Sequence, residues 1–464
     1  MCFEVGFETV GNATLIAHDE KPILATDPWI QGSAYFGSWG VSHEIPEEQL
    51  RAIRACPFVW ISHGHPDHLS GDSMQLLRDK QVLLPDHVGQ RVFRDLTEQG
   101  FQVRVLEDRK WVELSPRVRV LSIADYNQDG ILLVDVNGRL VVNLNDASDH
   151  GWGGFVRRVV ARYPRSFLLS LTGFGDADMF NLRGEDGDLL PMPPRTPLGQ
   201  TLSSRAKFWG ASAAIPFSAM HRYQRVDSAW ASQQSATLAD YAVGFDGKAA
   251  ELLPAFLRYD CLTDQVTPLN PRRIREPPRD PKEFGDDWSE TLDRAEEAKL
   301  RDYFLSIEHL RQTMAFIRFR VGGREALIEL RTRGFDKGLT FEVPRGSLLT
   351  TLQYEIFDDL LIGNFMKVTL HGEWGPGRLY PDFSPYVAKY ADNGRAKTLE
   401  QLRAYHRAYY ERDRLGYLRH KFDSGFLLPV QAKASRFLRS RLGAHSSAFR
   451  WSKAAYWKVK SVIS

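Results

Sequence analysis

The first half of the chain is built from short apolar runs that stop abruptly at polar side chains. Residues 57–61 form one such run, which ends at Ser62 and leads into three histidines and an aspartate. Two later runs, 118–124 and 140–144, lead into acidic residues in the same way. Apolar runs of this length with β-branched members predict buried strands. We therefore expect sheets whose strand ends gather polar side chains.

The other runs of the first half predict further strands with helices between them. Residues 14–25 predict a hairpin, and Asn137-Gly138 between two apolar runs is a strong signal for another. The Pro- and Gly-rich stretch 184–200 predicts a mobile loop or lid. We also predict helices at 46–55 and 70–80, and strands at 81–85, 130–136, 166–171 and just before His221.

The second half differs in pattern and predicts separate structural units. Residues 267–287 are rich in Pro and Arg, which indicates a linker. Beyond it we predict strands at 315–321, 326–331, 339–343 and 367–372, and helices starting at 290 and spanning 347–362 and 399–415. The predicted segments are an α/β catalytic domain (1–265), a linker (266–295), a smaller α+β domain (296–395) and a helical, basic C-terminal segment (396–464).

Composition narrows the possible partners and the cellular setting. The chain has 464 residues, 43% of them hydrophobic, and a formal net charge of +2. This near-neutral balance argues against nucleic acid as a partner. The three cysteines (Cys2, Cys56 and Cys261) make neither a disulfide framework nor a Cys-x-x-Cys site. Because we find no signal peptide and no apolar run of about 18 residues, we expect a cytoplasmic protein.

The stretch His63-Gly64-His65-Pro66-Asp67-His68 has the chemistry of a metal site. Imidazole and carboxylate are ligands that divalent cations prefer. Residues two apart in an extended segment project to the same side, so His63 and His65 can bind one ion. Asp67 and His68 follow around the bend and are predicted to face a second position. The sequence therefore predicts a two-ion site directly after a buried strand.

Other strand ends offer ligands for the same centre. Buried strands that end in acids are costly unless the charge meets a cation, which favours Asp125 and Asp146 as ligands. His221 follows a short strand and is a further candidate, with His150 as the reserve. We predict catalytic roles for Asp146 and Asp67.

A second set of residues is predicted to support the ligands or line the pocket. Asp27, at a strand end, is placed to hold a ligand imidazole by its second nitrogen, although it could instead cap a turn. Trp29, Trp39 and Tyr126 are predicted to border the site. His87 is predicted to lie at the surface or behind the ligands rather than to bind an ion.

These stretches, in this order, resemble the metallo-β-lactamase fold superfamily, and the His-x-His-x-Asp-His motif is the most specific mark. Within it, the chain most resembles the metallo-β-lactamase-like region of the CMP-N-acetylneuraminic acid hydroxylases. The resemblance covers roughly residues 5–295 and implies an αββα sandwich with a binuclear site at one edge. It is carried by residues 26–30 with Gly32 and Trp39, by 63–68, by 143–146, and by Pro216-Phe217, Glu276-Pro277-Pro278 and Asp287-Trp288.

The resemblance also implies how the ligands divide between two ions. The first ion would be held by His63, His65 and the residue at 125. The second would be held by Asp67, His68 and His221, with Asp146 bridging the two. Most of the superfamily has histidine where this chain has Asp125. A carboxylate in place of a nitrogen ligand makes the site harder, which favours iron over zinc.

Three classes of function follow from this resemblance. The first is a di-iron oxygenase that hydroxylates a small polar, sugar-like or lipid-linked substrate. The second is a binuclear zinc hydrolase that cleaves a phosphoester, ester or amide bond. The third is a non-catalytic binding protein that retains a metal site. No Rieske-type pair of Cys and His ligands accompanies the region, so an oxygenase would need an external electron donor.

The C-terminal part suggests two further contacts. The strand and helix succession of 296–395 resembles sterol-carrier-protein-2-like domains, with a generic α+β accessory domain as the alternative. Beyond Asp423 no acidic residue occurs, and basic and aromatic residues interleave. Such a segment can lie on an anionic membrane surface, at the inner face of a membrane, or pack on protein. The basic residues are Lys433, Arg436, Arg439, Arg441, Arg450, Lys453, Lys458 and Lys460.

Overall fold

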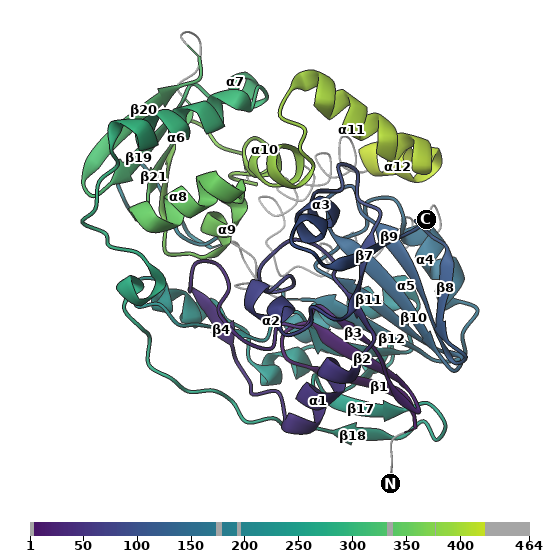
Figure 1. Cartoon of the computed structure of the whole chain (residues 1–464). Helices are drawn as coiled ribbons and strands as arrows, with labels where there is room; N and C mark the ends of the chain where they lie inside the picture. Colours follow the sequence, from purple (N-terminus) through teal and green to yellow (C-terminus); the bar gives the residue numbers. More distant parts are fainter. Residues whose placement is uncertain (1–3, 173–178, 193–195, 332–336, 376, 423–464) are drawn as a thin grey trace, which may run out of the picture.

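The structure is a computed structural model that describes residues 4–172, 179–192, 196–331, 337–375 and 377–422. Two mixed sheets face each other in its larger part (Figure 1). The first sheet has the order β18 (Val266–Pro268), β17 (Leu257–Asp260), β1 (Val5–Val10), β2 (Thr14–Asp19), β3 (Lys21–Thr26), β5 (Phe58–Trp60), β6 (Gln81–Pro85), β7 (Gln102–Leu106). The second has the order β16 (Glu251–Leu252), β14 (Ala213–Phe217), β12 (Ser166–Leu171), β11 (Arg139–Asn145), β10 (Gly130–Val136), β9 (Val118–Ala124), β8 (Trp111–Ser115).

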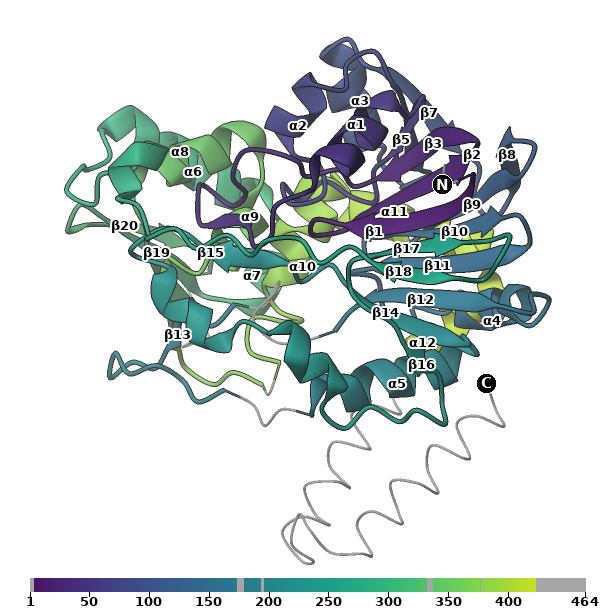
Figure 2. The same cartoon turned by 90° about the horizontal axis from the view of Figure 1, so that it is seen from below.

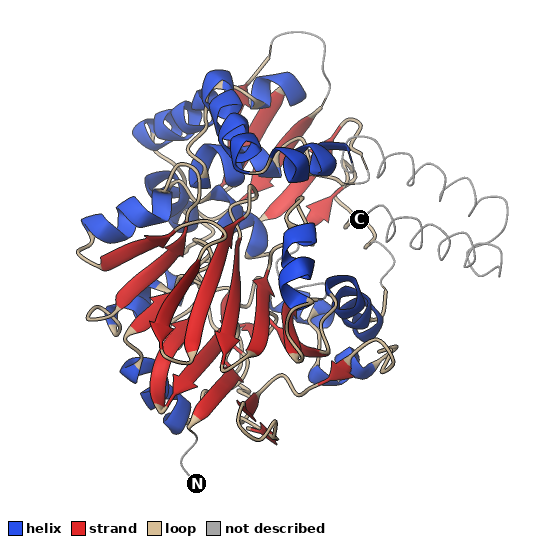
Figure 3. Cartoon of the chain, turned by 90° about the vertical axis from the view of Figure 1, so that its right-hand side faces the viewer, coloured by secondary structure: helices blue, strands red, loops and turns tan. Residues whose placement is uncertain are grey.

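Helices cover the outer faces of both sheets, as Figure 3 shows. The apolar core between the sheets includes Phe7, Trp60 and Phe167. Residues of α1–α3 pack on the first sheet, and residues of α4 and α5 pack on the second. These helices are α1 (Glu47–Ala55), α2 (Gly71–Gln75), α3 (Arg91–Glu98), α4 (Gly153–Val160) and α5 (Leu198–Trp209). The predicted αββα sandwich is therefore confirmed.

The central strands are buried on both faces, which explains their sequence pattern. Every residue of β1, β2 and β10 is buried. A strand covered on both sides needs a nearly continuous apolar run, because neither face meets water. The helix predicted at 70–80 is shorter, ending at Gln75, and α5 begins inside the predicted loop 184–200.

A third sheet lies beside the sandwich and is formed mostly by the C-terminal half (Figure 2). Its order is β13 (Leu182–Arg183), β22 (Lys367–His371), β21 (Gly338–Glu342), β19 (Phe316–Val321), β20 (Arg324–Glu329). The outermost strand, β13, comes from the first half of the chain and pairs in parallel with β22. A small two-stranded sheet joins β4 (Trp39–Val41) and β15 (His221–Tyr223).

The helix predicted at 347–362 is divided in two. Glu355, at the end of the first helix, has a φ of 52°. This left-handed conformation stops the helix, and a second one begins two residues later. The helices of this half are α6 (Arg294–Ser306), α7 (Leu310–Thr313), α8 (Arg345–Tyr354), α9 (Phe357–Ile362), α10 (Ser384–Val387), α11 (Leu399–Arg412) and α12 (Arg414–Phe422).

The predicted basic tail lies outside the described residues, which end at Phe422. Within the described part, the sequence offers no helix that is long and apolar enough to cross a bilayer. Membrane-surface contact and cytoplasmic location stay predictions, as do the four segment boundaries and the sterol-carrier resemblance.

Candidate metal centre

Parallel strands bring polar side chains to one edge of the sandwich. In the first sheet β3 and β5 run parallel, and they lead into Asp27 and Ser62. In the second sheet β11, β12 and β14 run parallel, so Asp146 and Ser218 follow at the same edge. Ligand sites in sheets of this kind form outside the carboxyl ends of the strands. The loop 63–68 continues from β5 into this same place.

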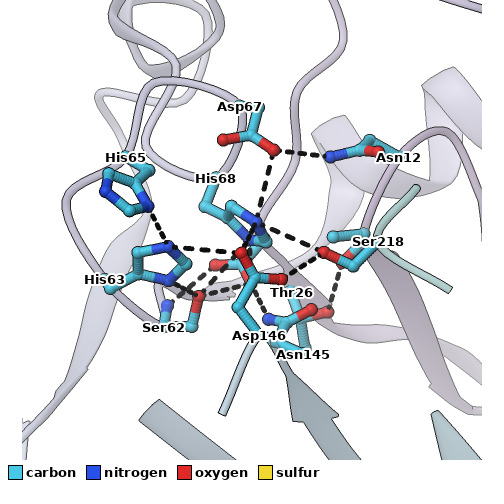
Figure 4. Close-up of polar contacts among 12 residues, drawn as sticks. Asn12, Thr26, Ser62, His63, His65, Asp67, His68, Asn145, Asp146 and Ser218 are labelled. Atoms are coloured by element: carbon cyan, nitrogen blue, oxygen red, sulfur yellow. Dashed lines mark hydrogen bonds and ion pairs between the residues drawn. The ribbon is translucent and has the colours of Figure 1, made fainter. Parts of the chain in front are cut away.

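The three histidines of that loop turn toward one another and toward Asp146 (Figure 4). His63 Nε2 lies 2.8 Å from His65 Nδ1. His68 Nε2 lies 3.4 Å from Asp67 Oδ2 and 3.5 Å from Asp146 Oδ2. His63 Nε2 is 3.8 Å from the same oxygen of Asp146. Asp146 therefore stands between the histidine pair and the Asp67–His68 pair.

Hydrogen bonds behind the rings determine which nitrogens carry protons. The Ser62 hydroxyl donates to Asp27 Oδ2 (2.8 Å), so it accepts a hydrogen bond from His63 Nδ1 at 2.9 Å. His65 Nε2 lies 2.9 Å from Asp358 Oδ2 and donates to it. His63 Nε2 and His65 Nδ1 then face each other at 2.8 Å. Burial would lower the pKa of His65, but Asp358 outweighs it and raises that pKa to about 9, so His65 Nδ1 donates to His63 Nε2 in the metal-free protein. A metal ion that replaces this proton would meet two nitrogens already directed at it, so the rings fit a shared metal ion.

The second position follows the same logic. His68 Nδ1 lies 3.1 Å from Asp27 Oδ2 and donates to it. The other ring nitrogen, Nε2, faces the carboxylates of Asp67 and Asp146. Burial would lower the pKa of His68, but these carboxylates outweigh it and raise the pKa well above its usual range, so the metal-free site holds a proton where a cation would bind. An imidazole nitrogen and two carboxylates that converge in a buried site are the donor set of a divalent cation. The donors at both positions therefore fit the two ions that the resemblance implies.

Electrostatics agree with a site built for cations. Burial lowers the pKa of His63 well below its usual range, and the neighbouring His68 and His65 lower it further. The ring is therefore neutral, as a metal ligand must be. Burial would raise the pKa of Asp146, but the charge and hydrogen bond of His68 outweigh it and hold the pKa below its usual range. Asp146 therefore remains a carboxylate.

Several side chains that the sequence did not single out hold the carboxylates in place. Asn12 donates through Nδ2 to Asp67 Oδ2 (2.9 Å), and the Tyr35 hydroxyl donates to Asp67 Oδ1 (2.6 Å). Ser218 donates to Asp146 Oδ1 at 2.6 Å. Each bond fixes the orientation of an acid that faces the centre. Tyr35 lies between Gly32 and Trp39, two residues that carry the resemblance. Asn12 and Ser218 carry no sequence signal without the fold.

Asp27 lies at the centre of this supporting network. It is completely buried. Besides the Ser62 hydroxyl and His68, it accepts hydrogen bonds from the Ser62 backbone N–H (2.7 Å) and from Asn145 Nδ2. One carboxylate thus ties β3, the histidine loop and the end of β11 together.

Comparisons with known proteins support the resemblance stated from the motif. The chain is 29% identical over 140 residues to cytidine monophosphate-N-acetylneuraminic acid hydroxylase of Asterias rubens, and 27% identical over 160 residues to that of Sus scrofa. The matches cover 28% and 32% of this chain. The chain carries a metallo-β-lactamase-like region. The matches span only 21% and 37% of those relatives' own lengths, and no family model matches the sequence.

Solved structures show a distant likeness to the metallo-β-lactamase-like region. CmlA, a diiron beta-hydroxylase from Streptomyces venezuelae, is 14% identical with a TM-score of 0.37, covering 57% of this chain and 54% of its own. A metallo hydrolase from Ignicoccus hospitalis is 15% identical with a TM-score of 0.35, covering 54% and 94%. At these TM-scores the likenesses support no inference about function.

Asp125 belongs to neither of the groups in which three ligand atoms converge, and its role as a ligand stays a prediction. Among the described residues, groups of at least three ligand atoms within 4.8 Å of one another are His63, His68 and Asp146, and His65, Asp358 and Asp359. Asp125 Oδ2 is instead 3.7 Å from His150 Nε2. Burial, followed by the charge of Asp129, raises the pKa of Asp125 well above its usual range.

A tight turn after β9 explains this placement. The Asp125 N–H donates to the Asp129 carbonyl at 2.9 Å, and Asp125 Oδ1 accepts from the Asn127 N–H at 3.1 Å. Burial raises the pKa of Asp129 in the same turn, and the charges of Lys389, Asp146 and His65 also act on this acid. Tyr126 faces α12, where its hydroxyl lies 2.8 Å from His420 Nε2. The turn therefore directs two acids to different surroundings.

His221 and the two predicted tryptophans form an aromatic flank of the metallo-β-lactamase-like region. The ring of His221 stacks on Trp39 with centroids 3.5 Å apart and an angle of 4° between the planes. Trp39 and Trp29 are both buried in one apolar cluster with Tyr35. Neither of the two groups of converging ligand atoms includes His221. Its role as a ligand stays a prediction.

His87 lies behind the histidine loop, as one of the two predicted placements has it. Its side chain is buried, and Nε2 lies 3.2 Å from the Ser62 carbonyl. Burial lowers the pKa of His87 to about 4, so the ring is neutral. The hydrogen bond from His87 to the Ser62 carbonyl holds the backbone that leads into the histidine loop.

Proposed function

We propose that this protein is a metalloenzyme that binds two divalent ions at the edge of its metallo-β-lactamase-like region. His63 and His65 bind the first ion, and Asp67 and His68 bind the second. Asp146 bridges the two positions. One observation carries the proposal, namely that a ring nitrogen of each of the three histidines lies with two carboxylates in one buried site.

The reaction that we favour is hydroxylation of a small polar, sugar-like or lipid-linked molecule. The similarity to the hydroxylases covers about a third of the chain, and an acid-rich donor set suits iron. Two bound irons would supply activation of dioxygen, with electrons from an external donor. The residues orient the centre, since Asn12 and Tyr35 fix Asp67 and Ser218 fixes Asp146.

The remaining ligand of the first ion is proposed to come from the turn after β9. Asp125 is the residue that the family pattern indicates, but its carboxylate faces His150. Asp129 lies in the same turn, near enough to His65 and Asp146 for their charges to affect its pKa. We therefore favour Asp129 for this position.

Hydrolysis by two zinc ions is the second candidate, and the position of Asp125 favours it. The argument for iron began with a carboxylate at 125 in place of a histidine. Because that carboxylate lies beside His150, the donors that converge in the structure also suit zinc. In this case a metal-activated water would attack an ester, phosphoester or amide.

Metal analysis of full-length protein purified without chelators tests the proposal. Two ions per chain are expected, and fewer than one would contradict a binuclear centre. Iron together with substrate-dependent oxygen uptake would support hydroxylation. Zinc, with no oxygen uptake and with hydrolysis of a test phosphoester or ester, would instead establish the second candidate.

A further inference from the structure

His65 forms a hydrogen bond with Asp358, a residue of the C-terminal half of the chain. Its Nε2 lies 2.9 Å from Oδ2 of Asp358, the second residue of α9. Asp358 is buried, with 8% of its surface exposed. The other ring nitrogen of His65 faces His63 and the proposed first ion. The third sheet's helical layer therefore reaches the metal centre itself.

Hydrogen bonds fix both ends of α9 against the metallo-β-lactamase-like region. Before the helix, Arg91 of α3 donates through Nη1 to the Glu355 carbonyl at 2.7 Å. After it, the Ser38 hydroxyl donates to the Gly363 carbonyl at 2.6 Å. Phe357 packs into the core of the third sheet. The helix therefore fixes the position of Asp358, which is a buried residue and not a flexible side chain on the surface.

We propose that Asp358 is a positioning residue for His65 in the metal centre, an inference that rests on the proposed function. Its carboxylate accepts a hydrogen bond from the Nε2–H of His65, which keeps that proton on Nε2 and leaves Nδ1 to bind the first ion. A carboxylate behind a ligand histidine also raises the basicity of the ring. The C-terminal half of the chain thereby becomes part of the metal site.

The same device occurs a second time on the other side of the centre. Asp27 accepts from His68 Nδ1 at 3.1 Å, so the ring of His68 also has a carboxylate behind it. An acid in the first turn of a helix is common because it favours the helix dipole. A solvated acid can interact with the helix dipole in this way without any imidazole partner. Asp358 is instead buried and lies 2.9 Å from the ring of His65, so the helix dipole alone does not explain its position.

The test compares Asp358→Ala and Asp358→Asn in the full-length protein. Zinc is the probe, and competition with a chelator gives the affinity of each of the two ions separately. We expect Asp358→Ala to weaken the first ion about 10- to 100-fold and to leave the second nearly unchanged. Asp358→Asn keeps an acceptor oxygen and should recover part of the affinity.

Nitrogen-15 NMR of histidine-labelled protein provides a readout besides metal affinity. The spectra are recorded above pH 9, because Asp358 raises the pKa of His65 to about 9. There the ring of His65, identified by the signal lost in His65→Gln, should hold its proton on Nε2 in the metal-free wild type. In Asp358→Ala it should show a mixture of the two tautomers. An unchanged tautomer with unchanged affinity for the first ion would overturn the proposal.

Two further results would also overturn it. Equal weakening of both ions, together with a lower melting temperature, would indicate a merely structural role. A third zinc in the wild type that disappears in Asp358→Asn would make Asp358 a ligand in a group with His65 and Asp359. The control Glu355→Gln removes a nearby acid that pairs with Lys397 and should change neither ion. If the wild type binds no zinc at all, the proposed function fails instead.

Discussion

The cluster of histidine and carboxylate around His63 and His68 differs from a second cluster, formed by Asp125 and His150, in how the polar atoms are paired. Around His63 and His68, two ring nitrogens lie 2.8 Å apart, and ring nitrogens lie 3.1–3.8 Å from the carboxylates of Asp27, Asp67 and Asp146. In the second cluster, Asp125 Oδ2 and both nitrogens of His150 have no hydrogen-bond partner within the described residues. Both clusters lie at strand ends, so position alone does not make a site. The difference is that supporting groups hold the first cluster in place before any ion binds.

Removing the bridging acid should have the largest effect. Asp146→Ala is expected to lose at least one ion, with a fall in affinity of at least about 100-fold, because both positions lose a ligand. Metal content and chelator competition would measure this. Asp246→Ala, in an exposed turn, should keep both ions. Full retention of two ions by the Asp146 variant would remove it as the bridge.

Removing the supporting acid of the first cluster should cost stability. Asp27→Ala leaves the donors of Ser62, His68 and Asn145 buried without their acceptor. We expect a loss of about 3–5 kcal/mol in the free energy of unfolding of the metal-free protein. Asp79→Ala removes an exposed acid and should cost less than about 0.5 kcal/mol. Equal losses in urea unfolding would show that Asp27 is no more important than a surface acid.

Acid should weaken the backbone support that His87 gives. The pKa of His87 is about 4 in the folded protein, whereas the unfolded chain has the ordinary value of 6.5. As the pH falls, the unfolded chain therefore takes up the proton first. The neutral His87 ring makes its full contribution to the free energy of unfolding above pH 6.5, and this contribution falls as the pH drops from 6.5 toward 4. By pH 5 the loss is about 2 kcal/mol. His87→Gln should flatten this pH dependence of unfolding in metal-free protein, and an unaltered slope would contradict the buried, neutral ring.

The smallest expected effect is on the affinity for the first ion, and it distinguishes Asp125 from Asp129 in the turn after β9. Asp129→Asn should weaken the first ion about 10-fold, roughly 1.4 kcal/mol. Asp125→Asn should leave both affinities unchanged, because its carboxylate faces His150. Chelator competition on both variants decides between them. The reverse result would restore Asp125 as the ligand and merge the two clusters.

Local patterns predicted the sandwich well because buried strands need continuous apolar runs and turns need particular residues. The same patterns placed the histidine loop after β5 and Asp146 after β11. They could not show that the turn after β9 places Asp125 beside His150, since that depends on a backbone hydrogen bond to Asp129. The local patterns could not predict the role of Asp358 for another reason. It is 293 positions from His65, and only the docking of α9 brings the two together.

The strand β13 has a consequence for how this chain can be made and divided. It contributes two residues from the first half to the edge of the third sheet, beside β22. The third sheet is therefore complete only after the chain has been synthesised past β22. Until then β13 lacks the strand with which it pairs. Unpaired edges invite aggregation. A fragment cut between the two halves should express poorly, whereas both halves joined by their native connection complete each other's sheet.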